Sequence, residues 1–139
     1  MAGGSQIYFR EGCLMNLYET RKVDFRHQDW RGSLVQLVHG GFNQINVLES
    51  KSGAARGSHY HKRAIEAFYV VSGCVVVRLW DKEKEEIATF RQGDFFEIHP
   101  FILHNMYFLE DCLMVQMYDI PVENEDGTKD IFTEDDFYA

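Results

Sequence analysis

Cysteine and proline are scarce in this 139-residue sequence, which holds three of the first and two of the second. The cysteines, Cys13, Cys74 and Cys112, lie far apart, are odd in number and form no Cys-x-x-Cys pair. This pattern argues against a disulfide framework and against a zinc knuckle, and it favours a reducing compartment. We therefore expect a cytoplasmic protein.

Long apolar runs and an excess of basic residues are also missing. No segment approaches the roughly 20 apolar residues of a membrane-spanning helix, and we expect no membrane association. The first residues lack the apolar stretch of a secretory signal. The formal net charge is -8, and residues 121–139 alone carry seven acidic side chains and one basic side chain. Because nucleic-acid binding needs a basic surface, this balance argues against it.

The chain does contain many short β-branched and aromatic runs separated by turn residues. Ser72-Gly73, between two such runs, predicts a hairpin turn, and the charged stretch 81–86 predicts another hairpin tip. Near the end, T-E-D-D-F-Y predicts one helical turn behind a Thr133 cap. Eight to ten strands in this arrangement indicate an all-β barrel over residues 1–120, in a single domain. The acidic tail, 121–139, is expected to be either solvated or a strap over the mouth of the barrel.

Four side chains of metal-binding type stand out. His59 and His61 are two residues apart, so on a strand they point to the same face, while Tyr60 points away. A turn after His61 would let the next strand return antiparallel and bring Glu66 alongside, and His104 is a fourth donor. Three imidazoles and one carboxylate suit a divalent transition metal such as Zn, Fe, Mn or Ni. Two other interpretations remain open. The residues could carry out acid–base chemistry without a metal, or they could form a polar cluster that hydrogen-bonds within itself in a barrel that has lost its function.

The spacing around these residues resembles the cupin family. The first cupin motif, G-x5-H-x-H-x4-E-x6-G, fits at every fixed position: Gly53, His59, His61, Glu66 and Gly73. The second motif fits at Gly93 and His104 and departs from the family elsewhere, at His99, Phe101 and Phe108. The resemblance implies a jelly-roll β-barrel with the site inside one end.

A narrower resemblance concerns the run R-G-S-H-Y-H from Arg56 to His61. It is similar to the signature of cupins that act on nucleotide-linked deoxysugars, namely 3,5-epimerases and 3,4-ketoisomerases, and to the cupin domain that ends some capsular-polysaccharide reductases. This implies an isomerase or epimerase acting on a nucleotide-linked keto-deoxysugar in polysaccharide biosynthesis. In such an enzyme His59 and His61 would move protons, and Arg56 would bind the diphosphate of the substrate.

One spacing departs from the ketoisomerases, which tend to have one residue fewer between the second histidine and the acidic position. The four-residue spacing between His61 and Glu66 is that of metal-binding cupins. A metal-dependent small-molecule cupin of the dioxygenase kind therefore stays open, as does a non-catalytic sugar-binding module. Because small jelly rolls commonly cover their edge strands, we also expect a homodimer, with a strand within residues 6–17 as a candidate for exchange.

Overall fold

The computed structural model describes residues 16–139, so most of the N-terminal strand that we expected to exchange lies outside the described residues. Within this range the chain forms strands and one short helix, α1 (Glu134–Tyr138). The twelve described strands are β1 (Glu19–Thr20), β2 (Phe25–Asp29), β3 (Gly32–Gln36), β4 (Gln44–Ser50), β5 (Ala55–Tyr60), β6 (Glu66–Ser72), β7 (Cys74–Trp80), β8 (Glu85–Arg91), β9 (Phe95–Ile98), β10 (Leu103–Phe108), β11 (Cys112–Tyr118) and β12 (Phe132–Thr133).

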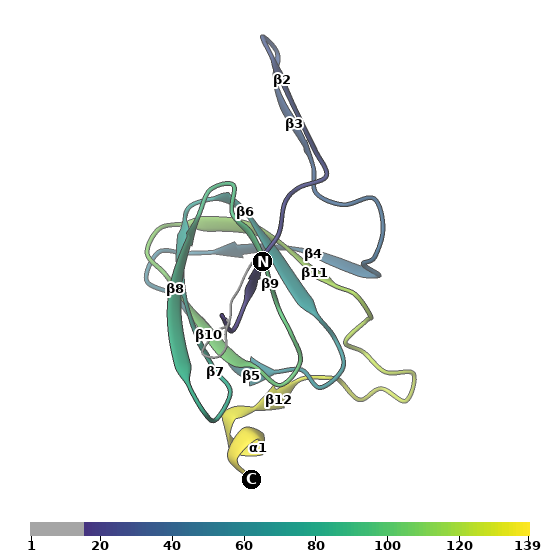
Figure 1. Ribbon diagram of the computed structural model, residues 1–139, viewed down its shortest axis with the longest axis vertical. Helices are drawn as coiled ribbons and strands as arrows, with labels where there is room; N and C mark the ends of the chain where they lie inside the picture. Colours follow the sequence, from purple (N-terminus) through teal and green to yellow (C-terminus); the bar gives the residue numbers. More distant parts are fainter. Residues whose placement is uncertain (1–15) are drawn as a thin grey trace, which may run out of the picture.

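Ten of these strands form two antiparallel five-stranded sheets that face each other (Figure 1). The first sheet has the order β1-β9-β6-β11-β4, and the second has the order β12-β5-β10-β7-β8. Alternate residues of the facing strands fill the space between the sheets, with Phe68, Phe96 and Phe108 among the fully buried side chains. The predicted all-β jelly-roll fold is confirmed, with two facing sheets that, over residues 16–139, are not joined into one closed barrel.

The local pairing of two predicted hairpins differs from expectation. β6 and β7, joined at Ser72-Gly73, do not pair with each other, because β6 pairs with β9 and β11 while β7 pairs with β8 and β10. The predicted hairpin is therefore wrong, and the turn instead carries the chain from one sheet to the other. Likewise β5 and β6 lie in opposite sheets, so Glu66 reaches the histidines across the interior. The hairpin between β7 and β8 is present as predicted.

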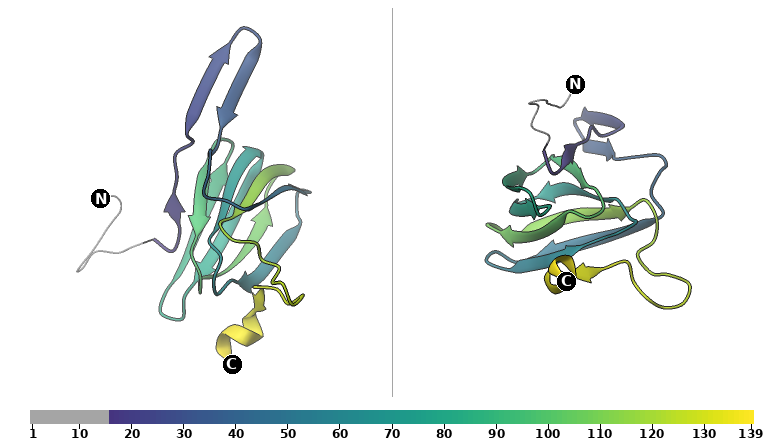
Figure 2. Two further views of the ribbon diagram at one scale, coloured as in Figure 1. Left: turned by 90° about the vertical axis from the view of Figure 1, so that its right-hand side faces the viewer. Right: turned by 60° about the horizontal axis from the view of Figure 1, so that its bottom comes forward.

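The strands β2 and β3 form a separate hairpin that projects from the body of the protein (Figure 2). Trp30 at its tip is 93% exposed, and Phe25 and Leu34 on its strands are also exposed. The chain then returns across the outer face of the first sheet, where Leu37 and Phe42 pack in a second apolar cluster. The projecting hairpin thus makes few apolar contacts with its own body.

The edge strand β4 turns its polar face inward. Gln44 and Asn46 are half-buried, and the side chain of Asn46 donates a hydrogen bond to Gln116, at 2.9 Å. Ile45 and Val47 on the opposite face are exposed. The interior of the barrel therefore contains polar groups at this end.

The C-terminal segment is an ordered part of the fold. β12 pairs with β5, and α1 begins at the predicted Thr133 cap, whose side chain accepts the N–H of Asp136. Phe137 of α1 is buried against Tyr60 and Trp80. Within residues 16–139 no helix has the length and apolar character needed to span a membrane.

Candidate active site

A bulge in β5 decides which of its side chains enter the barrel. His59 pairs with His104, whereas Gly57 pairs with the next residue of β10, Asn105, so Ser58 is an extra residue in β5. Beyond the bulge Arg56 pairs with Met106. Arg56 and His59 lie three positions apart and would face opposite sides of a regular strand. The bulge therefore brings both side chains to the interior face.

Glycine is required at this bulge. Gly57 has a φ of +108°, and a Cβ there would lie 2.9 Å from the Cα of Asn105 and 3.0 Å from the carbonyl oxygen of His104. Ser58 also takes a left-handed conformation, with φ of 66°. An L-residue in this region is strained by roughly 1–2 kcal/mol. The bulge in the Arg-Gly-x-His run thus places the side chains of Arg56 and His59 on the same face of β5.

Glu66 is the centre of a buried polar cluster. Its side chain is 1% exposed, and each of its two carboxylate oxygens has two partners. Oε1 lies 3.0 Å from Nε2 of His61 and 3.1 Å from Nε2 of His104. Oε2 accepts a hydrogen bond of 2.7 Å from Gln116 and one of 3.1 Å from the Tyr118 hydroxyl. A buried carboxylate is costly unless it is hydrogen-bonded, and here four partners compensate it.

The other ring nitrogens of the two histidines fix where their protons lie. Nδ1 of His61 is 2.6 Å from the carbonyl oxygen of Asp130, and Nδ1 of His104 is 3.0 Å from that of Ile102. Because a carbonyl oxygen only accepts, both Nδ1 atoms carry a proton. A hydrogen bond from either Nε2 to the Glu66 carboxylate then requires a second proton on that ring. The cluster is therefore built to hold an exchangeable proton.

The pKa shifts of Glu66 and His61 agree with this assignment of protons. Burial alone would raise the pKa of Glu66, but hydrogen bonds from His104 and His61 outweigh it and hold that pKa well below its usual value. Burial would lower the pKa of His61, yet the hydrogen bond and charge of Glu66, together with Asp130, raise it. His61 and Glu66 therefore form an imidazolium–carboxylate pair.

His59 differs from its neighbours because it is neutral. Burial and the nearby His104 lower the pKa of His59 to about 4. Its ring centroid lies 5.0 Å from that of His104 and 5.4 Å from that of His61. A neutral imidazole beside a cavity can accept a proton at physiological pH, so His59 has the properties of a general base.

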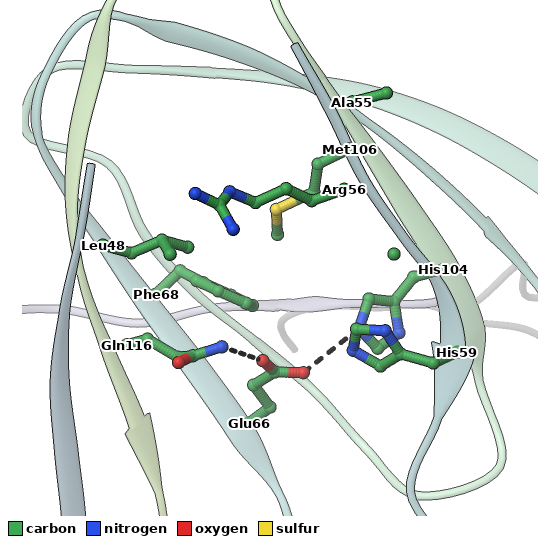
Figure 3. Close-up of a pocket in the computed structure, with 10 residues that line it drawn as sticks. Leu48, Ala55, Arg56, His59, Glu66, Phe68, His104, Met106 and Gln116 are labelled. Atoms are coloured by element: carbon green, nitrogen blue, oxygen red, sulfur yellow. Dashed lines mark hydrogen bonds and ion pairs between the residues drawn. The ribbon is translucent and has the colours of Figure 1, made fainter. Parts of the chain in front are cut away.

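His59 and Arg56 open onto one cavity of about 500 Å³, a size that suits a small-molecule ligand. Figure 3 shows His59 and His104 on one wall, Gln116 and Leu48 on the facing wall, and Arg56 projecting across the cavity near Met106. The cavity is lined by Leu48, Ala55, Arg56, Gly57, His59, Glu66, Phe68, His104, Met106 and Gln116.

Two hydrogen bonds to neighbouring residues orient the Arg56 guanidinium. Its Nε donates to the Ser50 hydroxyl at 2.8 Å, and its Nη2 donates to the carbonyl oxygen of Glu49 at 3.0 Å. The guanidinium has five N–H donors, so further donors remain for a ligand. This arrangement can fix an anionic group a short distance from His59.

The structure sorts the sequence-based candidates into three groups. His59, Glu66, His104 and Arg56 line the cavity, together with Phe68 and Met106, whereas Phe108 belongs to the apolar core. His61 lies one layer behind the cavity wall, only 3% exposed. The three other histidines of the described residues lie elsewhere, at exposed positions: His27, His39 and His99.

Three members of the polar cluster were missed from the sequence. Gln116 and Tyr118 lie in β11, where apolar residues surround them in the sequence and hide the inward-facing positions. Asp130 is one of seven acidic residues in the tail, and nothing in its local sequence distinguishes it from the others. All three contact Glu66 or His61 across the fold rather than along the chain.

Two facing antiparallel sheets with histidines and a glutamate inside one end form the jelly-roll fold that the resemblance to cupins implied. Residues 27–122 match the family described as Polysaccharide biosynthesis C-terminal domain. The chain belongs to this family. A comparison with curated proteins finds no match.

Solved structures of similar fold carry names of sugar-nucleotide enzymes. QdtA, a sugar 3,4-ketoisomerase from Thermoanaerobacterium thermosaccharolyticum in complex with TDP, is 19% identical over 90% of this chain and 93% of its own, with a TM-score of 0.75. A 3,4-ketoisomerase from Helicobacter canadensis is also 19% identical, over 86% of this chain and 93% of its own, with a TM-score of 0.73. A dTDP-4-dehydrorhamnose 3,5-epimerase from Sulfolobus tokodaii is 19% identical over 74% and 75% of the two chains, with a TM-score of 0.60.

The predicted metal cofactor is corrected by these comparisons. The four predicted ligand atoms, from His59, His61, Glu66 and His104, do lie within 4.8 Å of one another. However, the structurally similar proteins are TDP-sugar isomerases and epimerases, which act without a metal cofactor. The prediction of a divalent transition metal is therefore wrong. The physical reason is that residue types and spacing define the donor atoms, and the same donors also form a proton-holding cluster.

Proposed function

We propose that this protein is an isomerase or epimerase acting on a nucleotide-linked keto-deoxysugar in polysaccharide biosynthesis. One observation carries the proposal: the neutral imidazole of His59 and the guanidinium of Arg56 face the same cavity. A sugar nucleotide presents a weakly acidic C–H next to a ketone at one end and a diphosphate at the other. The cavity offers a base for the first and a fixed cation for the second.

The proposed reaction needs only proton transfers. His59 takes the proton from C3, next to the C4 ketone, and the C–H electron pair forms an enediolate with its negative charge on the C4 oxygen. Return of a proton to C4, with loss of the C3 hydroxyl proton, moves the ketone to C3. Return of a proton to C3 from the opposite face inverts that carbon instead. The same base thus serves ketoisomerisation or epimerisation.

His61 and Glu66 support this chemistry from behind the cavity wall. Nε2 of His61 and Oε1 of Glu66 share a proton across a distance of 3.0 Å, and Glu66 also borders the cavity. His104, bonded to the same Glu66 oxygen, faces His59. We propose that this cluster supplies and takes up the protons that His59 exchanges with the sugar. Oriented donors of this kind also stabilise a developing oxyanion.

The test is deuterium incorporation followed by NMR, with the protein mixed with dTDP-4-keto-6-deoxyglucose in D2O. Exchange at C3 with a new C3 ketone identifies a 3,4-ketoisomerase. Exchange at C3 and C5 without ketone migration identifies a 3,5-epimerase. Tight binding of the nucleotide without exchange would point to a binding module and contradict the proposal, as would the absence of any binding.

We also propose that the protein is a homodimer. An isolated two-stranded hairpin is only marginally stable, yet β2–β3 projects with Phe25, Trp30 and Leu34 exposed. The edge strand β4 exposes Ile45 and Val47, an apolar surface that a second copy could cover. Light scattering should give twice the 16.3 kDa chain mass, and Trp30→Ser should shift the protein toward monomer. A wild-type monomer at all concentrations would contradict this.

A further inference from the structure

The segment beyond residue 122, where the family match ends, lies against β5, the strand that carries Arg56 and His59. In β12, Thr133 pairs with His59 and Phe132 pairs with Tyr60. Phe137 of α1 is buried in the same cluster as Tyr60. The tail is thus attached along β5 by main-chain pairing and by apolar packing.

Asp130 connects this tail to the loop between His61 and Glu66. Asp130 is only 2% exposed. Its carboxylate accepts hydrogen bonds from three backbone N–H groups. Oδ1 accepts from Lys62 at 2.9 Å, whereas Oδ2 accepts from Arg63 at 3.0 Å and from Ala64 at 2.9 Å. A carboxylate with three such donors needs no cation beside it. Asp130 therefore holds the loop that leads from one member of the polar cluster to the next.

The main chain of Asp130 acts on His61 itself. Its carbonyl oxygen lies 2.6 Å from Nδ1 of His61, on the side of the ring opposite Glu66. The carbonyl keeps the proton on Nδ1 and sets the plane of the ring. Nε2 is then directed at Oε1 of Glu66, 3.0 Å away. Side chain and main chain of one residue thus fix both the loop after His61 and the ring of His61.

We propose that Asp130 is a positioning residue that holds His61 in the orientation and protonation pattern needed to pair with Glu66. Its effect on turnover rests on the function proposed above, whereas its effect on the His61 ring does not. Asp130 is the one buried acidic residue of the tail, whose other six acidic residues are exposed. Through this residue the tail supports the polar cluster under His59.

The test compares Asp130→Asn with a matched control, Asp119→Asn. An amide has a single acceptor oxygen, so the Asp130 variant loses the bond to Lys62 or the bonds to Arg63 and Ala64. Asp119 also accepts a backbone N–H of this loop, from Ile65, but through Oδ1 alone, which an amide can replace. Asp119 makes no hydrogen bond to His61 among the described contacts.

Two readouts separate positioning from general stability. The first is the NMR signature of the His61 ring nitrogens in the full-length labelled protein without substrate, assigned with His61→Gln. We expect a slowly exchanging Nδ1 proton in the wild type and in Asp119→Asn, and its loss in Asp130→Asn. The second is turnover in the deuterium-exchange assay, where Asp130→Asn should lower kcat by about 10- to 100-fold with KM nearly unchanged, as expected for a small misplacement.

An unchanged His61 signal and an unchanged kcat in Asp130→Asn would overturn the proposal. Should that variant fail to fold, the wild-type spectrum still decides, because a proton on Nε2 with a bare Nδ1 contradicts the assigned geometry. Absence of exchange in the wild type would refute the proposed function alone. The His61 signal would then still test the role of Asp130.

Discussion

The two ends of the barrel interior are built from the same strands but differ in chemistry. Along the inward face of β6, Glu66 is followed by Phe68 and Val70. Along β10, His104 is followed by Met106 and Phe108. Each strand thus passes from a polar cluster to an apolar core within two or three inward-facing positions. This division suggests that activity and stability can be altered separately.

The two ends are stabilised in different ways. At the apolar end, Phe90 and Phe96 stack with ring centroids 3.6 Å apart, and burial of such surface contributes about 25 cal/mol per Å². At the polar end, Glu66 depends on four polar partners for compensation. The apolar end supplies the stability that lets the polar end keep charged groups in the interior.

The largest expected effect is on turnover at the polar end. His59→Asn removes the proposed base and should lower the rate of deuterium exchange by about 10²- to 10⁴-fold, the usual contribution of general base catalysis. Nucleotide affinity and thermal stability should change little, because no described hydrogen bond depends on the His59 side chain. The control is His27→Asn, on the exposed β2 strand. Retained exchange in His59→Asn would mean that another group is the base.

The apolar end should respond in the opposite sense. Phe108→Ala leaves a cavity among fully buried side chains and should lower the free energy of unfolding by about 3–5 kcal/mol, measured by urea denaturation. Exchange activity per folded molecule should remain near the wild-type value. Phe101→Ala, at an exposed position, is the control and should cost far less stability. A loss of specific activity as large as that of His59→Asn would contradict the separation of the two ends.

Arg56 lies between the two ends and should affect binding. Arg56→Lys removes the hydrogen bonds to Ser50 and Glu49 that orient the guanidinium, so the affinity for dTDP should fall by about 10- to 100-fold. Titration calorimetry measures this change. Arg91→Lys, at the exposed end of β8, should bind dTDP as the wild type does. Equal affinities for the Arg56 variant and the wild type would remove Arg56 from the binding site.

The smallest expected effect concerns the pH dependence of kcat/KM. The pKa of His59 is lowered to about 4, so the base stays neutral, and active, well below the usual histidine pKa of about 6.5. The acid limb of kcat/KM should therefore lie near pH 4. The raised pKa of His61 places loss of the imidazolium, and of its pairing with Glu66, at a pH above the usual histidine value. An acid limb near pH 6.5 would contradict the neutral His59.

Much of the site could be predicted from the sequence because its spacing is local. The interval from His59 to Glu66 identified three members of the cluster, and His104 followed from the second motif. Arg56 was predicted from the Arg-Gly-x-His run, and the structure shows that this run contains a β-bulge. The all-β fold followed from the many short strands and their turn residues.

The remainder depended on contacts between distant residues. The turn at Ser72-Gly73 has the composition of a hairpin, but the strands on either side pair with partners elsewhere, which no local pattern reveals. Gln116 and Asp130 join the cluster from 50 and 69 residues away from their partners. The metal prediction was wrong because the same donor set also serves proton transfer.

The most direct test of the account is deuterium exchange into dTDP-4-keto-6-deoxyglucose with protein that has been treated with a chelator, alongside His59→Asn. The account predicts full exchange at C3 by the chelator-treated wild type and a loss of about 10²-fold or more in the variant. Exchange that vanishes with the chelator and returns with an added divalent metal, or that survives in His59→Asn, would contradict it.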